Sequence, residues 1–258
     1  MDLSIKGKLF VVTGATSGLG KGVATALLKE GAHIILVARG EEKLSEFEKK
    51  FPDQVEVLAG DITKPEIIEK VYAKTGERYL SGMLINAGGP PAKSFLETNV
   101  DDWDEAYNNI LKWKVLITKT FLPKFIKQNY GRIVYIESSS VKQPIENLVL
   151  SNSLRLAVVG FVKTLSQEIA GKGVTLNILA PGFHNTPAAE RLFVKRSEIE
   201  NISIEEAKLK YESEIKVGRM GKADEFGSLA AWLLSPVSGY ITGQTVSVDG
   251  GFIKCTMG

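Results

Sequence analysis

The stretch Thr13–Gly20, Thr-Gly-Ala-Thr-Ser-Gly-Leu-Gly, has the residue types and spacing of a phosphate-binding turn. Its glycines permit backbone conformations and close approaches that a side chain would prevent. Residues 8–12, Lys-Leu-Phe-Val-Val, are mostly apolar and predict a buried strand, whereas residues 21–29 have helical periodicity. A turn between a strand and a helix presents the free N–H groups and positive dipole of the helix start to an anion. We therefore expect a dinucleotide to bind here, although spaced glycines alone could serve only a tight turn.

This spacing resembles the short-chain dehydrogenase/reductase family, and further motifs extend the resemblance over nearly the whole chain. They are Asn-Ala-Gly at 86–88, Gly-Arg-Ile at 131–133, Pro-Gly at 181–182 and Asp-Gly-Gly at 249–251. The general texture is similar to 3-oxoacyl-acyl-carrier-protein reductases. The resemblance implies a single doubly wound α/β domain of Rossmann type over residues 1–258. It also implies hydride transfer to or from NAD(H) or NADP(H).

The resemblance places cofactor contacts at the carboxyl ends of the strands. After the strand expected at 33–38, the carboxylate that would bind the adenosine ribose is missing and Arg39 stands instead. A guanidinium suits a 2′-phosphate, so we expect NADP(H) rather than NAD(H), with a solvated arginine as the alternative. The expected cofactor-binding residues are Gly14, Thr16, Ser17, Gly18, Leu19, Gly20, Arg39, Asp61, Ile62, Asn86, Ala87, Gly88, Arg155, Pro181, Gly182 and Thr186. Asn86 could instead brace the sheet through its side chain.

The family's active site uses Asn, Ser, Tyr and Lys, and this chain keeps one of the four. Alignment to the motifs without a gap places Ser138 on the Ser, Ser151 on the Tyr, Arg155 on the Lys and Ile110 on the Asn. In the family the Tyr exchanges a proton with the substrate, and the Lys holds the nicotinamide ribose and lowers the Tyr pKa. Arg155 could keep the ribose contact, but the Ser151 hydroxyl is shorter and a poorer acid than a phenol. His184 is the substitute acid we consider, with a loop histidine without catalytic work as the alternative.

Alternating strand and helix patterns must position these residues, and they predict a parallel sheet covered on both faces. Besides the segments already named, we expect strands at 55–59, 83–85, 131–136, 174–179 and 245–248. We expect helices at 41–50, 65–74, 103–128, 150–170 and 223–234. Residues 187–216, with two weak helical patterns, correspond to the family's variable substrate lid.

Three functions stay open at this point. The favoured one is an NADP(H)-dependent oxidoreductase acting on a small carbonyl or alcohol substrate with an altered proton-transfer apparatus. The second is a catalytically silent protein that binds a cofactor or a partner. The loss of Tyr and Lys together favours it. A lyase or isomerase that reuses the pocket is the third.

Composition limits the other possibilities. With 32 basic and 30 acidic residues the formal net charge is +2, which gives no reason to invoke nucleic acid or a membrane surface. A single cysteine, Cys255, excludes an internal disulfide, and with two histidines it argues against a metal site. Residues 1–8 contain charges and no long apolar run, which argues against a secretory signal, and no apolar run has membrane-spanning length. We therefore expect a cytoplasmic protein. By resemblance we expect a homotetramer or dimer formed through helices at 101–128 and 150–170. Trp113 would lie on that surface or in the core.

Overall fold

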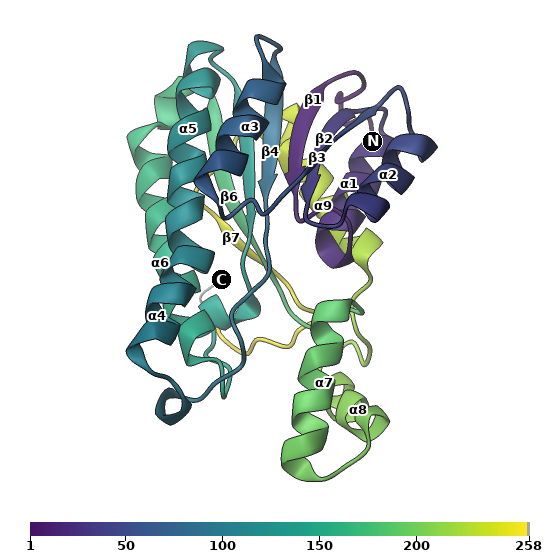
Figure 1. The fold of residues 1–258 in the computed structure, drawn as a ribbon, viewed down its shortest axis with the longest axis vertical. Coiled ribbons are helices and arrows are strands. Elements are labelled where there is room, and N and C mark those ends of the chain that lie inside the picture. The colour runs from purple at the N-terminus through teal and green to yellow at the C-terminus, as the bar shows by residue number, and fades with distance from the viewer. Residues whose placement is uncertain (257–258) are drawn as a thin grey trace.

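The computed structural model describes residues 1–256 as a three-layer α/β fold (Figure 1). Its strands form one parallel sheet in the order β3-β2-β1-β4-β5-β6-β7. They are β1 Leu9–Thr13, β2 His33–Ala38, β3 Val55–Ala59, β4 Leu80–Ile85, β5 Gly131–Ile136, β6 Val174–Pro181 and β7 Thr245–Val248. The strand order runs outward in both directions from β1 and β4. Their carboxyl ends therefore flank the crevice where doubly wound sheets bind ligands, and the expected fold class is confirmed.

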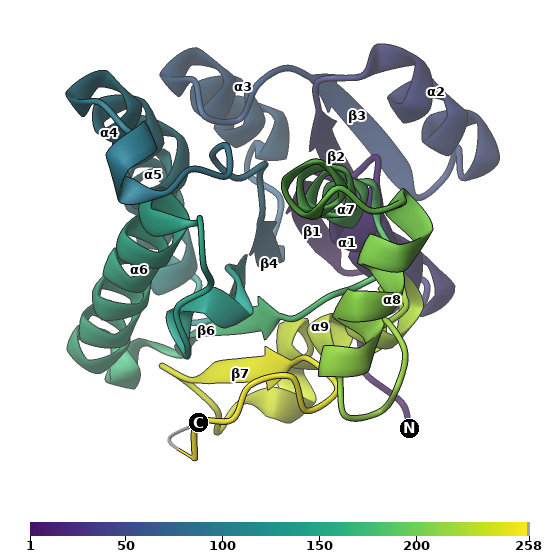
Figure 2. The ribbon, with the colours of Figure 1, turned by 90° about the horizontal axis from the view of Figure 1, so that it is seen from below.

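Two layers of helices cover the sheet, as Figures 1 and 2 show. One layer contains α1 Gly18–Lys29, α2 Glu41–Lys50 and α9 Ala223–Leu234, and the other contains α3 Pro65–Thr75, α5 Trp113–Lys127 and α6 Val149–Glu168. Successive side chains of a strand point to opposite faces of the sheet. Phe10 and Val12 therefore belong to the core under α1 and α9, whereas Val11 belongs to the core under α3, α5 and α6. α1 and α9 pack so closely that a Cβ on Gly22 would lie 2.1 Å from the Ala223 carbonyl oxygen.

The helix expected at 103–128 is divided in two by a wider turn. α4 spans Val100–Ala106, and a π-helical turn over Tyr107–Lys112 joins it to α5. The Trp113 indole N–H donates to the Asn109 carbonyl of this turn at 2.9 Å. Trp113 is only 1% exposed, so it is a core residue and not part of a subunit surface.

The region 187–216 forms two helices that project beyond the carboxyl edge of the sheet, α7 Pro187–Glu200 and α8 Ile204–Glu214 (Figure 1). The rings of Phe183, Phe193 and Tyr211 pack together where the pair meets the body. By contrast, Ile199 and Leu209 are exposed. The apolar residues of this segment therefore partly fill its own small core and partly remain on its surface.

Candidate functional site

The glycine-rich turn after β1 forms a cradle that fits a phosphate. Gly14 and Gly18 adopt left-handed backbone angles, with φ of 61° and 51°. A Cβ on Gly20 would lie 2.1 Å from the Gly14 carbonyl oxygen, so only glycine allows α1 to pack against the turn. α1 begins with no side-chain cap and no acidic residue in its first turn. Its first N–H groups are therefore available to an anion.

Thr13 and Asn86 fasten the carboxyl ends of β1 and β4 below this cradle. The Thr13 hydroxyl donates to the Asn86 carbonyl at 2.7 Å and accepts the Asn86 N–H at 2.8 Å. A Cβ on Gly14 would lie 2.6 Å from the Asn86 side-chain nitrogen. The Asn86 side-chain nitrogen also donates to the Gly14 carbonyl at 3.5 Å, and both interpretations of this residue, cofactor contact and brace, stay predictions.

Thr186 lies on the other side of the cradle. Its side chain would be 3.4 Å from a Cβ on Gly18, and its hydroxyl makes no cap hydrogen bond to α7. Gly182 is held next to β7 by its N–H, which donates to the Val248 carbonyl at 3.0 Å. Thr186 therefore borders the space in front of the α1 N-terminus, where phosphates would lie.

The adenosine end of the crevice is formed at the ends of β2 and β3. Arg39 is exposed directly after β2. The Asp61 carboxylate accepts hydrogen bonds from the backbone N–H and the hydroxyl of Thr63, at 3.0 and 2.9 Å, which shapes the turn. Ile62 is buried beneath it, and a Cβ on Gly88 would meet nothing within 4 Å. The contacts of these residues with a cofactor stay a prediction.

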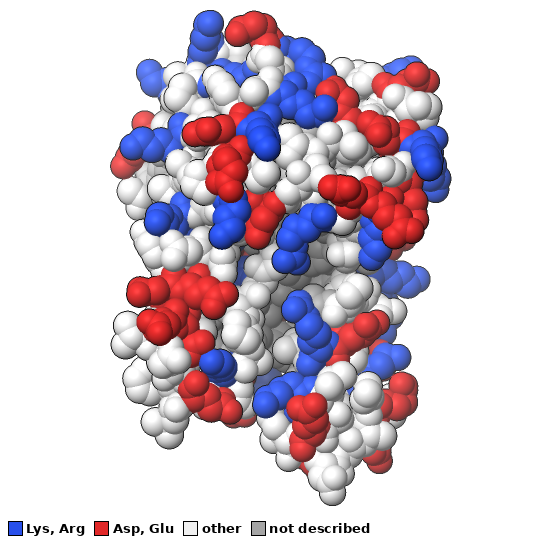
Figure 3. Space-filling view, viewed as in Figure 1, with Lys and Arg blue, Asp and Glu red and all other residues white. Residues whose placement is uncertain are grey.

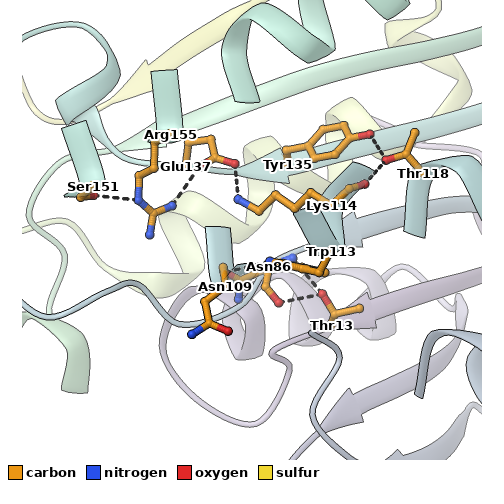
Figure 4. Close-up of polar contacts among 10 residues, drawn as sticks. All are labelled: Thr13, Asn86, Asn109, Trp113, Lys114, Thr118, Tyr135, Glu137, Ser151 and Arg155. Carbon is orange, nitrogen blue, oxygen red and sulfur yellow. Dashed lines mark hydrogen bonds and ion pairs between the residues drawn. The ribbon is translucent and has the colours of Figure 1, made fainter. Parts of the chain in front are cut away.

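Ser138, Ser151 and Arg155 lie at the opposite end of the crevice, beyond the ends of β4 and β5. Ser151 and Arg155 are four apart on α6, and the Arg155 Nε donates to the Ser151 hydroxyl at 3.0 Å (Figure 4). A Cβ on Gly89 would lie 2.9 Å from Arg155 Nη2, so the guanidinium reaches the loop after β4. The Ser138 hydroxyl accepts the Ser140 N–H at 3.1 Å.

Glu137 is a site residue that the sequence analysis missed. Its side chain is fully buried, and Oε2 accepts a hydrogen bond from Arg155 Nη1 at 2.9 Å, while Oε1 is paired with Lys114 of α5. Desolvation by burial lowers the pKa of Lys114 from 10.5 to about 8, although the Glu137 charge opposes the shift. An acidic residue directly after six buried strand residues was the available signal, because a buried carboxylate requires cationic partners.

Neither Tyr135 of β5 nor Tyr130 just before it replaces the missing Tyr. The Tyr135 hydroxyl is buried against Thr118 at 2.7 Å, and burial raises its pKa, whereas Tyr130 packs on Arg132. Ile110 is in the core. Asn109, beside it, donates to Glu105 at 3.3 Å.

His184 lies in a different environment from Ser138 and Arg155. Its Nδ1 is 3.1 Å from the Gly182 carbonyl, and its ring packs edge-on against Phe226 of α9. It lines a pocket of about 220 Å³ with Arg219 and Glu225, and burial lowers its pKa. The described contacts connect it to neither Ser151 nor Arg155, so they give the proposed acid no support.

Neither a metal-binding cluster nor a membrane-spanning helix is found in the described part of the chain. Within residues 1–256, no group of three or more His, Cys, Asp or Glu side chains is placed to hold a metal ion. None of the helices described there has the length and apolar character needed to cross a membrane.

The family is decided by comparison with known proteins. A family model described as enoyl-(acyl carrier protein) reductase matches residues 14–253. The chain belongs to the short-chain dehydrogenase/reductase family. It is 31% identical to the 3-oxoacyl-[acyl-carrier-protein] reductase FabG of Thermotoga maritima, over 97% of this chain and 100% of that protein. It is also 33% identical to dehydrogenase/reductase SDR family member 6 of Aquarana catesbeiana, over 96% and 98% of the two chains.

Solved structures of reductases have the same fold. A variant of actinorhodin polyketide ketoreductase with NADPH superimposes with a TM-score of 0.90 at 31% identity, covering 95% of this chain and 97% of that one. L-Sorbose reductase from Gluconobacter frateurii, in complex with NADPH and L-sorbose, has a TM-score of 0.90 at 26% identity, over 98% and 99%. The expectation of an NADP-type cofactor agrees with the NADPH in these two complexes. The family membership makes an oxidoreductase of the NAD(P)-dependent type the established class.

Proposed function

We propose that this protein is an NADP(H)-dependent oxidoreductase acting on a small carbonyl or alcohol substrate, with an active site that lacks the usual Tyr and Lys. The observation that carries the proposal is the Arg155 guanidinium, bonded to Ser151 and reaching Gly89. It provides a permanent positive charge at the position where the family has its Lys.

The crevice residues fit the cofactor along its length. The N–H groups at the start of α1 and the hydroxyl of Thr186 would hold the pyrophosphate, and Arg39 would bind the 2′-phosphate. Figure 3 shows a hollow in the face seen in Figure 1, and several Lys and Arg side chains, with some Asp and Glu side chains, lie around it. When bound, NADP(H) would supply or accept hydride at its nicotinamide ring.

Two serine hydroxyls can donate a hydrogen bond to the substrate oxygen. Because Ser151 Oγ accepts the Arg155 Nε–H, its own proton remains available to a substrate oxygen. The Ser138 hydroxyl likewise accepts from Ser140 and can donate. The Arg155 charge would stabilise negative charge that develops on the substrate oxygen. A proton donated by a serine would be replaced from water, because a serine hydroxyl is too weak an acid to remain ionised.

A catalytically silent, cofactor-binding or regulatory protein is the alternative. The observation that favours it is that the Ser151 hydroxyl is hydrogen-bonded to the Arg155 guanidinium, which stays protonated in proteins and cannot act as a general acid. The lid role of α7 and α8 and a homotetramer or dimer remain predictions of the family resemblance. A cytoplasmic location remains a prediction from the sequence composition.

A fluorescence titration with NADPH and, in parallel, NADH tests the cofactor. Tight NADPH binding with weak NADH binding is expected, and lack of binding to either at millimolar levels would contradict the proposal. A screen of carbonyl substrates that follows NADPH consumption then separates the two functions. Turnover that Arg155→Ala abolishes supports the oxidoreductase, whereas NADPH binding without turnover of any carbonyl supports the silent protein.

A further inference from the structure

We propose that Glu137 is a positioning residue, which holds the Arg155 guanidinium so that Nη2 reaches the nicotinamide ribose of the bound cofactor. Lys114 anchors Glu137 from the opposite side. This inference rests on the proposed function, since it concerns the same cofactor site. It adds two residues that lie outside the family's four active-site positions.

The placement of Glu137 follows from matched spacings on β5 and α5. Tyr135 and Glu137 are two residues apart along an extended chain, which separates them by about 6.6 Å on one face. Their partners Thr118 and Lys114 are four apart on a helix, a separation of about 6 Å. Because the strand and helix run in opposite directions, both pairs form together. The Glu137 N–H also donates to the Leu179 carbonyl at 2.9 Å, which extends the ladder to β6 past the end of β5.

The guanidinium has three nitrogens, and two of them are already held. Nε is 3.0 Å from Ser151 Oγ, and Nη1 is 2.9 Å from Glu137 Oε2. The group is planar and rigid, so fixing two nitrogens also fixes the third. Nη2 is the nitrogen next to Gly89, at the carboxyl end of β4. The two contacts therefore aim Nη2 at the place where the nicotinamide ribose hydroxyls would lie.

Stability alone does not explain this cluster. Two cations share one carboxylate whose side chain has no solvent exposure, with Lys114 only 4% and Arg155 11% exposed. Replacing such a buried cluster by apolar side chains of similar volume is often neutral or stabilising. The arrangement does, however, keep an arginine side chain in one orientation. Figure 4 shows the four side chains in a row from Ser151 on α6 to Lys114 on α5.

Two probes test the proposal by fluorescence titration or calorimetry. NADPH spans the whole site, whereas 2′,5′-ADP occupies only the adenosine end. Glu137→Gln is expected to weaken NADPH binding about tenfold or more and to leave 2′,5′-ADP binding within about twofold. Arg155→Met should cause the same selective loss. The double variant should lose little more than either alone, because the two residues act as a unit.

Glu56 provides a matched control. Its carboxylate is also shared by two cations, Arg78 and Lys74, but at an exposed site remote from Arg155. Glu56→Gln should leave both probes unaffected. If Glu137→Gln does not fold, the pair Lys114→Met and Glu137→Gln removes the unmatched buried cation, and the same selective loss is expected.

Three results would overturn the positioning role. They are unchanged NADPH binding by Glu137→Gln, equal weakening of both probes, and additive losses in the double variant. A wild-type protein that binds NADPH no more tightly than 2′,5′-ADP would also overturn it. A wild-type protein that binds neither probe would instead overturn the proposed function.

Discussion

Replacing Lys114 with Met should change how the stability of the protein depends on pH. The ammonium group is buried and paired with Glu137, and desolvation lowers its pKa from 10.5 to about 8. Met has a similar length and no charge. The variant therefore removes the titrating group and keeps most of its packing.

The sign follows from the protons that each state binds. Below pH 8 both the folded and the unfolded protein hold the Lys114 proton, so the cost of burying the charge is fully present. Between pH 8 and 10.5 the unfolded chain binds more protons, so the free energy of unfolding rises with pH. A shift from 10.5 to about 8 gives a rise of about 2 kcal/mol between pH 7 and pH 10.

Urea denaturation of the wild type and Lys114→Met at these two pH values measures this effect. The difference in unfolding free energy, wild type minus variant, should become more positive by about 2 kcal/mol at pH 10. Taking this difference cancels the titration of other groups such as Tyr135. Lys119→Met is the control, because Lys119 lies on the same helix and its side chain is exposed. A Lys114 difference that is independent of pH would refute the buried, depressed lysine.

The remaining predictions concern the cofactor site and His184. Arg39→Ala should weaken NADPH binding about tenfold and leave NADH binding unchanged, which a parallel titration measures; equal effects on both would exclude contact with the 2′-phosphate. Gly20→Ala brings a Cβ to 2.1 Å from the Gly14 carbonyl, so it should weaken NADPH binding severely, and wild-type affinity would contradict the cradle. Ser138→Ala should lower kcat by about 10²-fold in steady-state assays with KM nearly unchanged, and an unaltered kcat would remove Ser138 from the reaction. Because burial lowers the pKa of His184 below its usual 6.5, the unfolded state binds more protons as the pH falls through that value. His184→Gln should therefore lose less stability than the wild type between pH 7 and pH 5, as urea denaturation would show; identical losses would place the histidine in a more hydrated environment.

The sequence by itself was sufficient for the order of strands and helices and for the glycine turn. Apolar runs such as residues 34–38 and 133–136 are buried in strands because both faces of a parallel sheet are covered by helices. The glycines at 14 and 20 were recognisable because a turn between strand and helix restricts which residue types can stand there. These features depend on neighbours in the chain, which is why they could be predicted locally. The π-helical turn at Tyr107–Lys112 was missed, since no periodicity of side chains marks it.

Only the tertiary structure decided which side chains share the reacting end of the crevice. The alignment brought Ser151 and Arg155 to one helix face, but it did not show that Glu137 and Lys114 complete their network. Those contacts join α5 and α6 to the residue that directly follows β5, and they depend on how each helix is rotated and shifted against the sheet. His184 follows Pro181 and Gly182 closely in sequence, yet the chain turns its ring towards α9. Patterns between neighbours in the sequence therefore determined the helices and strands. The packing of those elements against one another determined which charged side chains meet.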